Sequence, residues 1–234
     1  MSLGKLSVRT YVRYLVPLTM LSVIAFSPLV LIALRVPVPG NAKQAQIALN
    51  YAWVLAGCSV IPLFLLVGGV APAVRGIADG APRSQLAVLG AGLVGLARTA
   101  VPCLLAVAAI AIGGLACVVP GLVLLVLLAL TGASVEDGAP ARLTDSIAIA
   151  RTRVLPIIGV IVVMLAVQAT AIFVLSRPLV PLPKKPPPEH LAAFRQLVRI
   201  TVAGIALAAP IAAVALAAIH ARARQQLAAR PTAT

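Results

Sequence analysis

Long apolar runs separated by short polar segments dominate this chain of 234 residues. A helix crosses a hydrocarbon core of about 30 Å with about 20 residues, at a rise of about 1.5 Å per residue. Runs of this length predict six membrane-spanning helices, near 14–34, 47–74, 100–119, 121–135, 154–176 and 200–219. The predicted fold is therefore all-α, a polytopic transmembrane helical bundle of about six spans with interfacial amphipathic helices, in one domain over residues 1–234.

The third and fourth spans share one uncharged run of 36 residues, 100–135. As a single helix this run would measure about 54 Å, which is too long for one crossing. Pro120-Gly121 is the expected break, because proline cannot donate to the preceding turn and glycine permits a reversal. Gly113-Gly114 is the alternative position for the turn.

Arg98 interrupts the apolar stretch that begins after residue 84. A base at the centre of a bilayer costs about 2.5–3.5 kcal/mol on insertion scales. We therefore expect 85–98 to form an interfacial or entering helix. The alternative is a tilted helix whose Arg98 side chain reaches the interface.

Polar or small residues within two spans predict contacts between helices. Gln168 and Thr170 are expected to bond to a neighbouring helix rather than to a substrate, and Pro62 is expected to kink the second span. Gly204, Ala208 and Ala212 recur at a spacing of four, which predicts a face for close helix packing.

The loop 136–153 combines both signs of charge with helical periodicity. We predict that 139–153 forms a surface helix at the cytoplasmic interface, with an apolar stripe that includes Leu143 and Ile147. The candidate interface residues are Glu136, Asp137, Arg142, Asp145, Ser146, Arg151 and Arg153. Alternatively the helix caps the bundle, with Glu136 and Asp137 neutralising nearby arginines and Ser146 bonding to the backbone.

Composition agrees with a bilayer protein, since 62% of residues are hydrophobic and 10% are charged. The net charge of +14 comes from bases spread between the apolar runs, so it predicts contact with membrane lipids and no nucleic acid. Twelve Lys and Arg residues fall on the side of the termini and seven on the other. The positive-inside rule then predicts that both termini are cytoplasmic.

Side chains that carry chemistry are few. All five acidic residues lie between the spans, and the three cysteines have no paired spacing. Gly90, Gly92 and Gly95 form G-x-G-x-x-G inside an apolar segment, where a dinucleotide site is not expected. The sequence therefore predicts no catalytic residue, no metal site and no cofactor.

Residues 118–153 hold a Pro-Gly pair that opens a span, an acidic-Gly element and a short helix with Leu and Ser. The matching residues are Pro120-Gly121, Glu136 with Gly138, Leu143 and Ser146, whereas Arg142 and Thr152 replace a usual Ala and Gly. This pattern resembles the membrane domain of some bacterial glycerophosphodiester phosphodiesterases and its stand-alone relatives. The resemblance implies a helical domain of the bacterial inner membrane. It implies no phosphodiesterase activity, because that chemistry belongs to a separate soluble barrel.

Three functions remain open from the sequence. The first is a non-enzymatic membrane module that organises lipid or a partner protein at the cytoplasmic face. The alternative is a transporter or channel for an apolar or lipid-like solute, because spans broken by proline and glycine line paths without ionisable groups. The third is a membrane-embedded enzyme that uses loop acids such as Glu136, Asp137 and Asp145.

Overall fold

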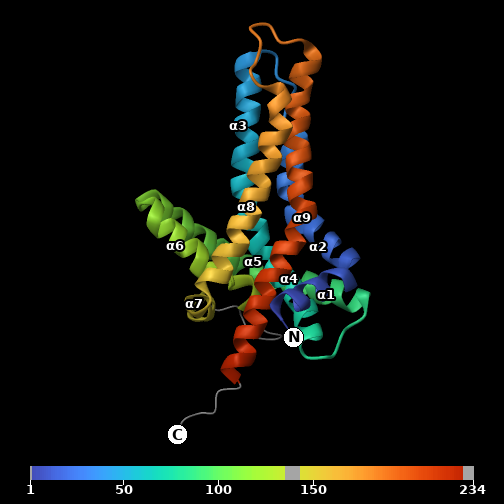
Figure 1. Cartoon of the computed structure of the whole chain (residues 1–234), viewed down its shortest axis with the longest axis vertical. Coiled ribbons are helices and arrows are strands. Elements are labelled where there is room, and N and C mark those ends of the chain that lie inside the picture. Colours follow the sequence, from blue (N-terminus) through green and yellow to red (C-terminus); the bar gives the residue numbers. More distant parts are fainter. Residues whose placement is uncertain (1, 135–142, 229–234) are drawn as a thin grey trace.

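Every regular element that the structure describes is a helix (Figure 1). The structure is a computed structural model that describes residues 2–134 and 143–228. Its elements are α1 (Leu3–Arg13), α2 (Leu15–Arg35), α3 (Ala42–Cys58), α4 (Val60–Ala78), α5 (Gln85–Ala116), α6 (Val118–Leu128), η1 (Thr131–Ser134), α7 (Leu143–Thr152), α8 (Val154–Ser176), η2 (Arg177–Leu179) and α9 (Pro188–Ala228). Five helical segments are long and apolar enough to cross a membrane, which confirms the all-α membrane bundle.

The helix α9 is the axis of the bundle and packs against α1, α2, α3, α4 and α8. Its buried face is rich in alanine, including Ala206, Ala209, Ala213 and Ala217. Small side chains let neighbouring backbones approach, which is how helices associate where lipid is as apolar as leucine. Ser22 of α2 donates a hydrogen bond to the Ala206 carbonyl, and this bond ties the first span to the axis.

The second span is divided between α3 and α4, which meet at Ser59. Pro62 lies in the first turn of α4 and has no N–H to bond to the carbonyl of Cys58. The buried Ser59 hydroxyl donates to the Ala56 carbonyl at 2.6 Å and closes the last turn of α3. The disruption expected from Pro62 therefore takes the form of a helix break three residues earlier.

The predicted span 100–119 falls mostly within a segment long and apolar enough to cross a membrane, Gln85–Leu115, and the predicted span 121–135 corresponds to a shorter apolar segment, Val118–Ser134. Helix α5 runs unbroken over Gln85–Ala116, so residues 85–98 are its first half. The Arg98 side chain is exposed and lies near the middle of α5 rather than at its end, so both alternatives for this residue stay predictions. The turn lies at Cys117, and Pro120 falls in the first turn of α6, where a missing N–H costs nothing.

Helix α6 turns back along α5 to form a hairpin that projects obliquely from the lower half of the bundle (Figure 1). The two backbones touch, because a Cβ added to Gly121 would lie 2.7 Å from the Cα of Gly114. Leu115 near the tip is 88% exposed, and Val118 on the other arm is 69% exposed. The 11 residues of α6 rise about 17 Å, about a third of the rise of the 32-residue α5.

Helix α2, the α3–α4 pair, α8 and α9 run between the two ends of the bundle. Figure 1 shows α1 and the last turns of α9 at one end, and the connection between α8 and α9 at the other. The start and the end of the described chain therefore lie at the same end of the bundle, and the side of the membrane that this end faces stays a prediction.

Glycines allow α4, α5 and η1 to meet with their backbones in contact. A Cβ added to Gly95 would lie 2.6 Å from the carbonyl oxygen of Gly68, and one added to Gly132 would lie 2.7 Å from the nitrogen of Gly68. A Cβ on Gly92 would lie 2.8 Å from the oxygen of Gly69. Two glycines of the G-x-G-x-x-G sequence therefore serve helix packing.

Replacing Gly95 with alanine should destabilise the fold, because its new methyl group meets rigid backbone. We expect Gly95→Ala to lower the free energy of unfolding by about 1–3 kcal/mol, as for other overpacked sites. Gly90→Ala is the matched control, since nothing lies within 4 Å of its added Cβ. Thermal unfolding of both variants in detergent tests this prediction. Equal melting temperatures would contradict the close contact of α5 with α4 at Gly95.

The predicted orientation is tested by cysteine labelling in a background without Cys58, Cys103 and Cys117. Because Lys185 lies in the connection between α8 and α9, Lys185→Cys should react with an impermeant maleimide outside intact cells. Ala81→Cys, at the opposite end between α4 and α5, should react only after permeabilisation. Labelling of position 185 only from the cytoplasm would contradict the predicted orientation.

Candidate functional site

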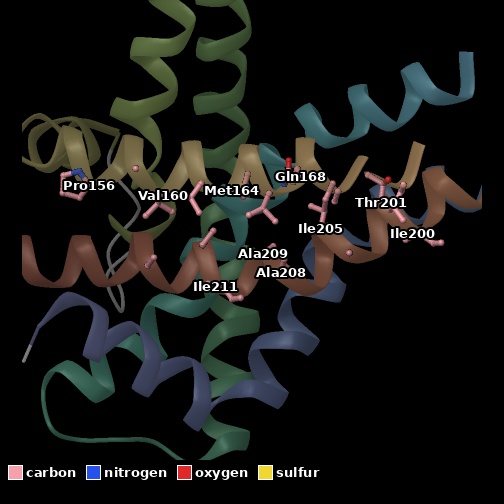
Figure 2. Close-up of a pocket in the computed structure, with 18 residues that line it drawn as sticks. Pro156, Val160, Met164, Gln168, Ile200, Thr201, Ile205, Ala208, Ala209 and Ile211 are labelled. Atoms are coloured by element: carbon pink, nitrogen blue, oxygen red, sulfur yellow. The ribbon is translucent and has the colours of Figure 1, made fainter. Parts of the chain in front are cut away.

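A groove of about 650 Å³ lies between α8 and α9 (Figure 2). These two antiparallel helices supply all of its described walls, which are almost entirely apolar. It extends from Leu175 and Ile200 near the connecting loop to Pro156 and Ala215 toward the other end. This volume is within the range of about 300–1,000 Å³ that is typical of small-molecule sites.

Small residues on both helices leave room for the groove. Gly159 of α8 and Gly204 of α9 both line it, and nothing lies within 4 Å of a Cβ added to either. The close-packing face predicted at Gly204, Ala208 and Ala212 is met only by Ala212, which is 8% exposed and belongs to the core. Gly204 and Ala208 are exposed along one wall of the groove.

The mouth of the groove faces outward from the bundle. Val163 on α8 is 63% exposed and Ile211 on α9 is 57% exposed, and both belong to the lining. Both helices are apolar enough to cross a membrane, so these side chains face the acyl chains of the bilayer. The groove is therefore open to lipid from the side.

Gln168 is one of two polar side chains in the lining, and its amide is hydrogen-bonded to a residue that does not line the groove. Its Nε2 donates to the Ser59 hydroxyl at 3.1 Å, and both residues are buried. This contact confirms the predicted bond to a neighbouring helix for Gln168, whereas Thr170 is exposed on α8. The bond from Gln168 also anchors the middle of α8 to the break between α3 and α4.

Thr201 is the second polar residue of the lining. Its side chain is 5% exposed, and its hydroxyl has no hydrogen-bond partner in the described part of the chain. Figure 2 shows it on the side of α9 that faces α8. A buried hydroxyl without a partner costs about 1–3 kcal/mol, so this position is unfavourable in an empty groove.

The predicted cytoplasmic interface is described only in part. Glu136, Asp137 and Arg142 lie outside the described residues, as does the side chain of Asp145 in α7. Ser146 is buried, and its hydroxyl donates to the Leu127 carbonyl at 2.9 Å. The alternative in which this helix caps the bundle predicts such a bond from Ser146 to the backbone.

Helix α7 packs its buried residues Ile149 and Ala150 against the rest of the bundle, where its main neighbours are α6 and η1. Arg151 is exposed and Arg153 is half-buried, at the junction with α8. These two bases remain the described part of the predicted interface. They lie at the same end of the bundle as α1 (Figure 1).

The sequence interpretation missed α1 as a separate amphipathic helix. Lys5, Arg9 and Arg13 lie on its exposed face, while Leu6 and Thr10 are buried. The helix is held in place by bonds at its C-terminal end, since the Tyr14 hydroxyl donates to the Arg83 carbonyl at 2.9 Å. The spacing of four between the bases was the signal that could have identified this face.

Among the described residues, no three His, Cys, Asp or Glu side chains come together as a metal site would require. Comparisons with family models, with curated proteins and with solved structures found no match for this chain. The resemblance of residues 118–153 to the phosphodiesterase membrane domain therefore stays a prediction.

The bond between Gln168 and Ser59 should couple α8 to the helix break. We expect Gln168→Leu and Ser59→Ala each to lower the melting temperature, and the double variant to lose less than the sum. The coupling free energy should be about 0.6–1.7 kcal/mol, as for hydrogen bonds between membrane helices. Additive losses in a double-mutant cycle would show that the two side chains do not stabilise each other.

Proposed function

We propose that this chain is a non-enzymatic membrane module that binds lipid, with one acyl chain held in the groove between α8 and α9. The observation that carries the proposal is the groove itself, whose apolar walls open sideways to the bilayer. A soluble ligand would have to cross headgroups and hydrocarbon to reach it. Acyl chains are already present at its mouth at very high concentration.

Basic residues at the ends of the helices support contact with the headgroups of the same lipids. Lys5, Arg9 and Arg13 of α1 and Arg151 of α7 expose their side chains at one end of the bundle. Bases near an anionic surface contribute about 1 kcal/mol each. We propose that this end faces the cytoplasm of a bacterial inner membrane, as the charge bias and the resemblance predict, and that a protein partner would bind there.

The alternative function is transport of an apolar or lipid-like solute. It is favoured by the break at Ser59, because interrupted spans line the substrate sites of many transporters. Gln168 links this break to the helix that forms the groove. Movement of α8 relative to the break would then alter the groove, and solute flux into vesicles distinguishes transport from binding alone.

Filling the groove should abolish lipid binding. Ala208→Phe places a ring in the space between α8 and α9, so we expect at least a tenfold loss of lipid co-purified with the protein. Ala203→Phe is the matched control, since Ala203 is exposed on the same helix and does not line the groove. Lipid mass spectrometry at equal protein recovery measures both, and equal lipid content in the two variants would refute the proposed site.

A further inference from the structure

We infer that the groove selects a lipid-like molecule whose apolar chain carries an oxygen at one end, and that the Thr201 hydroxyl binds this oxygen. The inference rests on the proposed function and adds the chemistry of the ligand to it. It comes from three observations: the state of the Thr201 hydroxyl, its place along the groove, and the bonds of the other polar side chain in the lining.

The hydroxyl of Thr201 is buried and is not bonded within the described part of the chain. In helices, threonine usually bonds to a carbonyl of its own preceding turn. Thr10, Thr19 and Thr99 do so in this chain, with Oγ1 at 2.8 Å from the carbonyls of Leu6, Leu15 and Gly95. Thr201 makes no such bond, although it is buried and lies in the middle of a helix.

The place of Thr201 gives the ligand a direction. Thr201 lies beside Ile200 at the end of the groove nearest the connection between α8 and α9, and the wall continues from there to Ala215. Thr201 is about 20 Å along α9 from Pro188, which sets it below the polar loop of residues 180–187. Arg199 is the last charged residue before an uncharged run that extends to Ile219, and it donates to the Leu34 carbonyl at the end of α2. Thr201 therefore lies where the part of α9 that suits hydrocarbon begins.

Gln168 does not compete for this oxygen. Its amide nitrogen is used by Ser59, and it lies farther along the groove than Thr201 (Figure 2). The rest of the lining is apolar. One oxygen followed by a hydrocarbon chain therefore complements the groove from end to end, and the oxygen can be an ester carbonyl or a hydroxyl because Thr201 both donates and accepts.

The test uses the full chain in phosphatidylcholine nanodiscs and a hexadecanol probe with a photoreactive diazirine at mid-chain. Mass spectrometry of the labelled peptides reports whether α8 and α9 are modified. Unlabelled hexadecanol, methyl hexadecanoate and hexadecane then compete with the probe. We expect hexadecanol to compete about five- to tenfold better than hexadecane, as one hydrogen bond in apolar surroundings would provide.

Thr201→Val removes the hydroxyl and keeps the shape, so it should make hexadecanol compete no better than hexadecane. Thr201→Ser should restore the preference. Thr170→Val is the matched control, because Thr170 is exposed on α8 outside the groove. Methyl hexadecanoate identifies the source of the oxygen: competition equal to that of hexadecanol indicates an ester lipid, and competition equal to that of hexadecane indicates a lipid alcohol.

Two outcomes distinguish lipid binding in the groove from the role of Thr201. If the probe labels α8 and α9 and Ala208→Phe prevents it, but Thr201→Val keeps the preference for hexadecanol, the groove binds lipid and the role of Thr201 is refuted. If the probe labels neither helix in the unaltered protein, both lipid binding in the groove and recognition of an oxygen by Thr201 are refuted.

Discussion

Backbone contact between α4, α5 and η1 at Gly68, Gly95 and Gly132 determines how the other helices are arranged. Because no side chain separates these backbones, α5 crosses α4 closely and then continues away from the bundle with α6. Helix α8 packs mainly against α9 and α3, and much of its surface is exposed. Of an 18-residue apolar segment of α8, 22% is buried inside the protein, against 67% for the equivalent segment of α9. The open groove between α8 and α9 follows from this uneven packing.

Spans bounded by charge were predicted well from the sequence. The first and fifth predicted spans, 14–34 and 154–176, agree with α2 and α8 within one residue. Both begin next to an arginine that marks the edge of the apolar run. The run 100–135 has no such marks, and a proline fits the first turn of a helix as well as it breaks one. The position of that turn depends on contacts between Gly113, Gly114 and Gly121, which periodicity does not encode.

The groove could not be predicted for a related reason. Small residues at a spacing of four, such as Gly204 and Ala208, serve equally to bring two helices together and to leave space between them. Which outcome occurs depends on the distance of α8, and that distance is determined by contacts elsewhere, including the bond from Gln168 to Ser59. Thr201 was similarly inconspicuous, because its importance comes from a hydrogen bond that it does not make.

The hairpin of α5 and α6 has a further physical consequence for the surrounding bilayer. Side chains on both of its arms are exposed, Leu115 by 88% and Val118 by 69%. Most of the apolar surface of α9 is instead covered by other helices. The outline of the protein that acyl chains must cover is therefore longer than it would be if α5 and α6 lay alongside the other helices.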